Sequence, residues 1–86
     1  MKPEYHKSFR KQFDKLPLKI QDKFGERLDM FLQNQFHSLL NNHSLSGEYE
    51  GCRSINITGD IRAIFYIKSD SNCVFINIGP HSELYE

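Results

Sequence analysis

Hydrophobic residues recur at helical spacing in the first third of the chain. From His6 to Leu16 the apolar positions Phe9, Phe13 and Leu16 lie three or four residues apart, which predicts a helix. Pro17 interrupts it, because proline lacks a backbone N–H and clashes with the preceding turn. A second apolar stripe runs to about residue 35, so the sequence predicts an antiparallel helix pair. The members of this stripe are Ile20, Phe24, Leu28, Phe31 and Leu32.

The hydrophobic period then changes from 3.6 to 2, which predicts strands joined by the turns TGD and SDSN. The predicted strands are residues 49–57, 61–68 and 73–79, with a short edge strand at KPEY and a loop over 36–46. Helices followed by hairpins are typical of an α+β fold. We expect a single domain, residues 1–86, in which an N-terminal helical hairpin packs on one face of a small antiparallel β-sheet.

Alternation within the strands sorts the side chains onto two faces. The set predicted to face the helices is Ile55, Ile57, Ile61, Ala63, Phe65, Ile67, Val74, Ile76 and Ile78. The set predicted to face away is Cys52, Ser54, Asn56, Asp60, Arg62, Ile64, Tyr66, Lys68, Cys73, Phe75 and Asn77. Ile64 and Phe75 on the second face suit burial by a partner.

The turns fix the expected register, because a slip of one residue moves every side chain to the other face. A turn at TGD sets Asn56 opposite Arg62. A turn at SDSN pairs Lys68 with Cys73, Tyr66 with Phe75 and Arg62 with Gly79. Two residues further along, Asp60 lies opposite His81, with Cβ atoms roughly 4.5 to 5.5 Å apart. We therefore expect Asn56, Asp60, Arg62 and His81 to cluster at one end of the sheet.

Gly25 lies inside the second predicted helix. Glycine there costs about 1 kcal/mol relative to alanine. The residue indicates either close helix packing or a tolerated defect.

Two cysteines, Cys52 and Cys73, stand in a chain without a signal-peptide pattern or a long apolar run. Their spacing matches no zinc-binding pattern, and no metal cage or cofactor motif is evident. We expect a reduced, soluble, cytoplasmic protein that does not bind membranes and uses no cofactor.

Charge is uneven although the formal net charge is zero. Residues 1–28 hold eight Lys and Arg against four Asp and Glu, while residues 29–86 hold three against seven. The basic helical hairpin is either a solvated surface or a contact for RNA phosphates.

A histidine beside a carboxylate and an arginine suggests phosphate chemistry. His81 can transfer protons near neutral pH, Asp60 can orient it, and Arg62 can clamp a phosphate with two hydrogen bonds. His43, in the loop before the sheet, supplies a second proton-transfer group. Metal-independent RNA cleavage needs this set, because the 2′-OH is deprotonated, attacks the adjacent phosphate, and the 5′-oxygen leaves protonated.

Each residue also has a structural interpretation. Asp60 follows a glycine and is a common turn residue. Arg62 is equally consistent with a surface ion pair, and His43 with an ordinary loop histidine. A polar open face also suits protein binding.

Two longer segments resemble a known family. HSLSGEYEGCRSINITGDIRAIFY and FINIGPHSELY are similar to the RelE/ParE superfamily of toxins from type II toxin-antitoxin systems, particularly the YafQ-like mRNA interferases. The resemblance covers the chain in order, from the basic helices with their KLP junction to the C-terminal HSELY. It implies a RelE-like fold, ribosome-dependent cleavage of mRNA that inhibits translation, and inhibition by a cognate antitoxin. It also implies ribosomal RNA contacts through the basic helical hairpin.

The resemblance carries roles onto individual residues. His43 and His81 match catalytic histidines of the YafQ-like branch, and Asp60 matches the acidic residue at the hairpin. Arg62 matches the arginine that stabilises the transition-state phosphate in the RelE branch. The resemblance thus assigns all four to the catalytic site. Tyr85 matches an aromatic residue that positions the substrate; a residue that pins the tail to the core is the alternative.

Two further residues, both in the strand predicted over 49–57, are assigned to substrate binding. They are Arg53 and Asn56. Asn56 stands where YafQ-like relatives have histidine and RelE-like relatives have lysine, so one role at that position is missing or displaced.

Two other functions fit such a chain. One is a ParE-like inhibitor of DNA gyrase, which does not require the histidines. The other is a catalytically inactive toxin relative that only binds its antitoxin.

Overall fold

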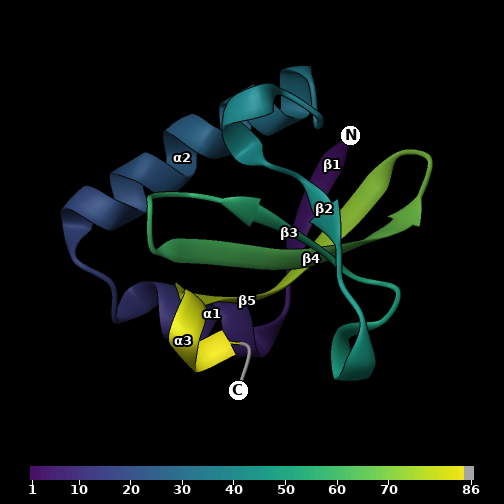
Figure 1. The fold of residues 1–86 in the computed structure, drawn as a ribbon. Coiled ribbons are helices and arrows are strands. Elements are labelled where there is room, and N and C mark those ends of the chain that lie inside the picture. Colours follow the sequence, from purple (N-terminus) through teal and green to yellow (C-terminus); the bar gives the residue numbers. More distant parts are fainter. Residues whose placement is uncertain (85–86) are drawn as a thin grey trace.

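A computed structural model describes residues 1–84 and shows a five-stranded sheet with two main helices against it (Figure 1). The strand order is β1-β5-β4-β3-β2. The strands are β1 (Lys2–Tyr5), β2 (His43–Ser44), β3 (Arg53–Asn56), β4 (Ile61–Ser69) and β5 (Asn72–Pro80). The predicted α+β class and the KPEY edge strand are confirmed. The sheet is mixed, because β1 runs parallel to β5 whereas the other pairs are antiparallel.

The predicted helices are present with slightly shorter bounds. They are α1 (Lys7–Asp14) and α2 (Leu18–Gln33), followed by a single turn, α3 (His81–Leu84). His6 caps α1 by accepting the Ser8 N–H at Nδ1, and Gln21 of α2 donates to two backbone carbonyls at the end of α1. These bonds close the helical hairpin around Pro17. None of the helices within residues 1–84 has the length and hydropathy needed to cross a membrane.

The predicted loop and first strand contain further short elements. Two 3-10 turns are present, η1 (Ser38–Leu40) and η2 (Gly47–Tyr49), with β2 between them. The strand predicted over 49–57 begins only at Arg53, because the chain turns at Gly51, whose φ of 90° is left-handed.

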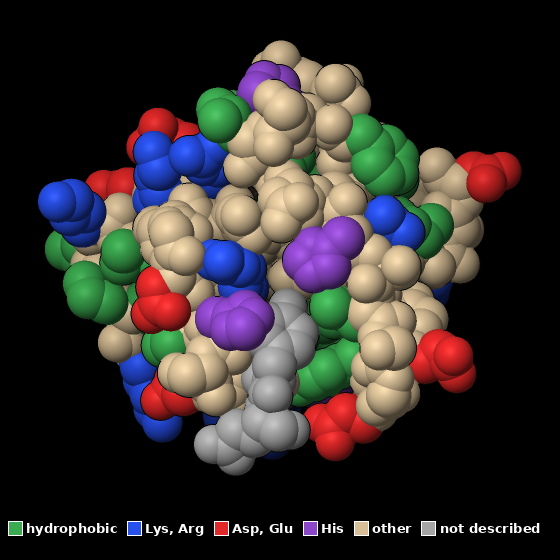
Figure 2. Space-filling model, viewed as in Figure 1, with side chains coloured by type: hydrophobic (Ala, Val, Ile, Leu, Met, Phe, Trp, Pro, Cys, Tyr) green, Lys and Arg blue, Asp and Glu red, His purple; other side chains and the backbone are tan. Residues whose placement is uncertain are grey.

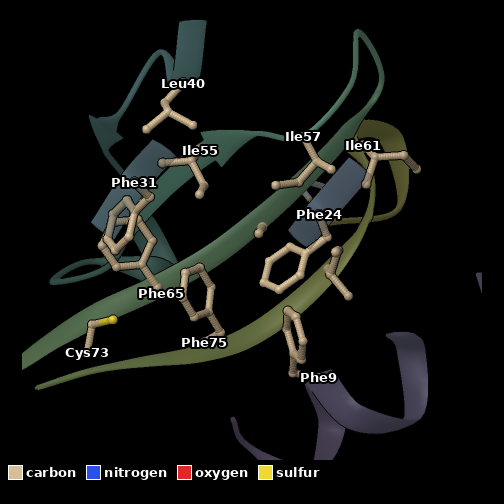
Figure 3. Close-up of a cluster of buried hydrophobic side chains, with 12 residues drawn as sticks. Phe9, Phe24, Phe31, Leu40, Ile55, Ile57, Ile61, Phe65, Cys73 and Phe75 are labelled. Atoms are coloured by element: carbon tan, nitrogen blue, oxygen red, sulfur yellow. The ribbon is translucent and has the colours of Figure 1, made fainter. Parts of the chain in front are cut away.

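The core lies between the sheet and the two long helices and is rich in phenylalanine (Figure 3). The Phe75 ring is central, with its centroid 5.3 to 5.8 Å from four other phenylalanine rings. These rings belong to Phe9, Phe24, Phe31 and Phe65. Aromatic rings at such separations add to the free energy gained by burying their apolar area.

The predicted faces of Cys73, Val74 and Phe75 are wrong. Cys73 and Phe75 lie in the core, whereas Val74 is absent from that cluster. The cause is an irregularity in β5: Ile64 pairs with Asn77 and Phe65 pairs with Phe75, so Ile76 is an extra residue. A bulge of this kind reverses the face of every residue beyond it.

The same bulge displaces the predicted pairs at the far end of the hairpin. Tyr66 pairs with Val74 rather than Phe75, and Cys73 pairs with Ile67 rather than Lys68. Ile67 is 42% exposed, against the prediction. Near the candidate site the register is as predicted: Asn56 pairs with Arg62, and Arg62 with Gly79.

Side chains of α1 complete the hydrogen bonding of β5 past the end of β1. Ser8 Oγ donates to the Ile76 carbonyl at 2.6 Å, and Gln12 Oε1 accepts the Ile78 N–H at 2.8 Å. Both backbone groups would otherwise lie on the edge of β5 beyond β1 without a partner. Side chains of α1 therefore satisfy backbone groups of β5 at the bulge and just beyond it.

Candidate functional site

The sheet face opposite the core is here called the open face, and two rows of paired residues cross it. The rows are His43, Ser54, Ile64 and Asn77, and then Asn56, Arg62 and Gly79. Ile64 is completely buried, so it is not the exposed partner-binding residue that the alternation predicted. Asn77 Nδ2 donates to the Tyr49 hydroxyl at 3.1 Å, which places η2 against this part of the face.

Arg62 lies between β3 and β5 with its guanidinium turned toward the β3–β4 turn. Its Nη1 donates to the carbonyls of Thr58 at 3.1 Å and Gly59 at 2.9 Å. An arginine carries five N–H donors. Within residues 1–84, Nε and Nη2 make no hydrogen bond. The turn thus fixes one edge of the guanidinium and leaves two nitrogens for an anion such as phosphate.

His43 is exposed on the edge strand β2, and the backbone before it sets its tautomer. His43 Nδ1 lies 2.8 Å from the carbonyl oxygen of Asn41. A carbonyl only accepts hydrogen bonds, so Nδ1 carries the hydrogen and Nε2 of the neutral ring presents a lone pair. Asn41 adopts a left-handed conformation, φ 46°, that asparagine tolerates better than most residues.

His81 opens α3 directly after β5. Its backbone N–H donates to the Asp60 carbonyl at 3.0 Å, which confirms that the two residues lie opposite each other. The bond joins backbones, and the Asp60 carboxylate accepts no hydrogen bond from the described residues. Gly79 is buried, and a Cβ there would lie 3.8 Å from Leu84 Cδ2, so α3 packs closely on the end of β5. This packing holds His81 at the rim of the open face.

Sheet geometry places Arg62 between the two histidines. Neighbouring strands are about 4.8 Å apart, and same-face residues along one strand about 6.8 Å apart. His81 is one strand and one row from Arg62, about 8 Å between Cα atoms, and His43 is two strands and one row away, about 12 Å. Figure 2 shows histidine side chains on this face beside a Lys or Arg side chain.

Asn56 carries the buried polar atom at this site that lacks a partner. Its Oδ1 is inaccessible to solvent and makes no hydrogen bond within the described chain. A buried acceptor without a donor costs about 1 to 3 kcal/mol. Asn56 lies directly across from Arg62 in the β3–β4 pair.

The remaining sequence-predicted residues do not join this cluster. Arg53 pairs with Phe65 on the core side of the sheet, where Nε donates to Asn42 Oδ1 at 2.7 Å and the guanidinium lies over the Phe36 ring. Tyr85 lies outside the described residues. No group of three or more His, Cys, Asp or Glu side chains within 1–84 is placed to hold a metal ion.

Two contributors were not anticipated from the sequence. Asn41 orients His43, and Tyr49 covers part of the open face. The pair Asn41–Asn42 ahead of His43 was an available signal, because asparagine favours left-handed backbone. Nothing local predicted the contact of Tyr49, which joins residues 28 positions apart.

Comparisons with known proteins place these features in a family. A family model described as "Bacterial toxin of type II toxin-antitoxin system, YafQ" matches residues 1–86. No protein of curated function matches the chain.

Solved structures share the fold. The crystal structure of YafQ from E. coli strain BL21(DE3) has 21% sequence identity over 98% of this chain and 97% of that one, with a TM-score of 0.80. The E. coli DinJ-YafQ toxin-antitoxin complex contains a chain with 24% identity over 98% and 96%, TM-score 0.73. HP0894 from Helicobacter pylori has 28% identity over 99% of both chains, TM-score 0.68. The predicted RelE-like fold is confirmed.

Proposed function

Because the chain belongs to the YafQ family of bacterial toxins from type II toxin-antitoxin systems, we propose that it is a ribosome-dependent endoribonuclease that cleaves mRNA and stops translation. The observation that carries the proposal is the position of Arg62. It lies between two histidines, and its Nε and Nη2 make no hydrogen bond within residues 1–84. A phosphodiester bound there has a proton acceptor on one side and a proton donor on the other.

The proposed reaction is transfer of the phosphoryl group to the neighbouring 2′-oxygen. His43 Nε2 removes the proton from the 2′-OH, and the oxygen attacks phosphorus. The bond from phosphorus to the 5′-oxygen breaks, and protonated His81 gives that oxygen its proton. Arg62 binds the phosphate oxygens, where negative charge builds up in the transition state. The products are a 2′,3′-cyclic phosphate and a 5′-OH.

Asp60 and Asn56 support the reacting groups. The Asp60 carbonyl accepts the His81 backbone N–H and holds that residue at the rim, and we keep the Asp60 side chain as the group that orients the imidazole. Asn56 Oδ1 accepts a hydrogen bond from the bound substrate, which supplies the partner that it lacks in the free protein. We keep Tyr85 as a substrate-positioning residue and Arg53 as a contact for the message outside the cluster.

The partners follow from the same proposal. The exposed cationic side chains of α1 bind ribosomal RNA phosphates, and the protein acts in the cytoplasm, where it meets ribosomes. These side chains are Lys7, Arg10 and Lys11, together with Lys15 at the C-cap. A cognate antitoxin inhibits the toxin, as the structure of E. coli YafQ bound to DinJ supports.

The test is 5′-end mapping of a translated message in a reconstituted translation system. We expect new 5′ ends with the wild-type protein on ribosome-engaged message only, and a loss of about 10²-fold or more with His43→Ala or His81→Ala. His6→Asn is the control, because asparagine retains the cap of α1 and the residue lies away from the open face. Intact message together with arrested growth would indicate gyrase inhibition instead. Intact message, normal growth and retained antitoxin binding would indicate an inactive relative.

A further inference from the structure

The outer side of α2 carries an exposed stripe of three residues at sevenfold spacing: Leu18, Gly25 and Leu32. Seven residues turn a helix to within about 20° of two full turns, so the three lie in one line along α2. Leu18 is 76% exposed and Leu32 is 37% exposed. Phe36 and Leu39, in the segment after α2, add two more exposed apolar side chains beyond its C-terminal end.

Nothing within residues 1–84 explains a glycine at position 25. A Cβ built there meets no atom within 4 Å, so close packing between the helices of this chain is not its reason. Glycine in a helix interior costs about 0.5 to 1 kcal/mol relative to alanine. The missing side chain instead allows another backbone to approach α2 from outside, midway between two leucines.

We propose that this outer stripe is the docking seam for a helix of the cognate antitoxin, with Gly25 at the point of closest approach. The inference rests on the proposed function, because it takes an antitoxin as the partner. Leu18 and Leu32 are aligned along α2 with Gly25 midway between them, so a helix laid lengthwise on α2 buries both leucines at once. The stripe faces away from the sheet, so this contact contributes affinity without itself covering the open face.

Charge beside the stripe defines the partner. Asp22 and Asp29 are exposed and lie within about 60° of Gly25 around the helix axis. A second copy of this chain packed antiparallel about Gly25 is a poor occupant, because Asp22 of each copy then lies beside Asp29 of the other. Like charges in contact destabilise an interface. The geometry therefore calls for an amphipathic helix with apolar residues at its centre and Lys or Arg along one edge.

Gly25→Gln separates binding from folding. Glutamine is a better helix former than glycine, and a side chain at this position has free space in the toxin alone, so the thermal midpoint of the free toxin should rise. The same side chain blocks close approach of a partner helix, so the Kd for the antitoxin should rise tenfold or more. Leu18→Gln is a second variant that should weaken binding with little effect on folding, since this leucine is largely exposed.

The binding assay uses the purified antitoxin, which is the protein that restores growth when it is co-expressed with the toxin. Lys19→Gln is the matched control, because it puts the same side chain on an exposed position of α2 about 120° from Gly25. Its Kd should equal that of the wild type. Titration calorimetry gives the affinities, and light scattering gives the oligomeric state.

Three outcomes overturn the inference. One is equal antitoxin affinity for the Gly25→Gln, Leu18→Gln and wild-type proteins. Another is a toxin dimer that Gly25→Gln dissociates while antitoxin binding is retained. The third is reduced mRNA cleavage with unchanged antitoxin affinity, which would assign the stripe to the ribosome. If no co-expressed protein restores growth, the proposed function fails instead, because the chain then has no antitoxin.

Discussion

The unsatisfied oxygen of Asn56 makes a prediction in which stability and activity change in opposite directions. Replacing Asn56 with valine removes a buried acceptor that has no donor and places a β-branched residue in a strand. A lone buried acceptor costs about 1 to 3 kcal/mol, so the free energy of unfolding should rise by about that amount. For a domain of this size each kcal/mol shifts the thermal midpoint by about 4 to 8 °C.

Asn77→Val is the matched control on the same face. Asn77 donates to the Tyr49 hydroxyl, so the identical substitution should lower the free energy of unfolding by about 1 kcal/mol. Thermal melts followed by circular dichroism measure both changes, and calorimetry checks two-state behaviour. Cleavage by Asn56→Val should fall by about tenfold, the value of one hydrogen bond to substrate. A midpoint for Asn56→Val at or below the wild-type value would refute the reasoning.

Two further predictions concern β5. Ser8→Ala leaves the Ile76 carbonyl at the bulge without its donor and should lower the free energy of unfolding by about 1 to 3 kcal/mol, measured by urea denaturation; a change below about 0.5 kcal/mol would show that water replaces the hydroxyl. Burial raises the pKa of the Cys73 thiol, so in the folded protein it should resist alkylation that modifies the unfolded chain. The pKa of the Cys73 thiol is higher in the folded protein than in the unfolded chain, so the thiol stabilises the fold at pH values below the unfolded pKa. This contribution is lost as the pH rises from about 9 through the folded pKa. A Cys73→Ala variant with the same alkaline loss of stability would exclude the thiol as its source.

The helices and the first hairpin were predictable because local patterns specify them. Phe9, Phe13 and Phe24 keep a clear helical period, and the polar residues of TGD fix the turn that pairs Asn56 with Arg62. The correct pairing of Asn56 with Arg62 is what made the candidate site recognisable from the sequence.

The β5 bulge was not predictable in the same way. Residues 73–76 read CVFI, so both faces of that segment are apolar and alternation cannot locate an extra residue. The bulge is specified by tertiary contacts, the Phe75 ring in the core and Ser8 on the Ile76 carbonyl. The parallel pairing of β1 with β5 likewise joins chain segments about 70 residues apart and leaves no local signal.

The geometry of the site depends on individual contacts that hydrophobic alternation does not predict. The motif GPHSEL predicted that His81 follows β5, but not that a backbone bond to Asp60 would hold it. The orientation of His43 depends on one left-handed residue, Asn41. Arg53 stands in a strand next to the site residues, yet the alternation of side chains turns it toward Phe36 on the other side of the sheet.

The central claim is that the open face cleaves RNA by attack of the 2′-oxygen. The most direct test is a message with a single 2′-deoxynucleotide at a mapped cleavage position, translated in a reconstituted system with the wild-type protein. The account predicts that the ribonucleotide message is cut there and that the 2′-deoxy message remains intact at that position. Equal cleavage of both messages would contradict the account, because no 2′-oxygen would then be required.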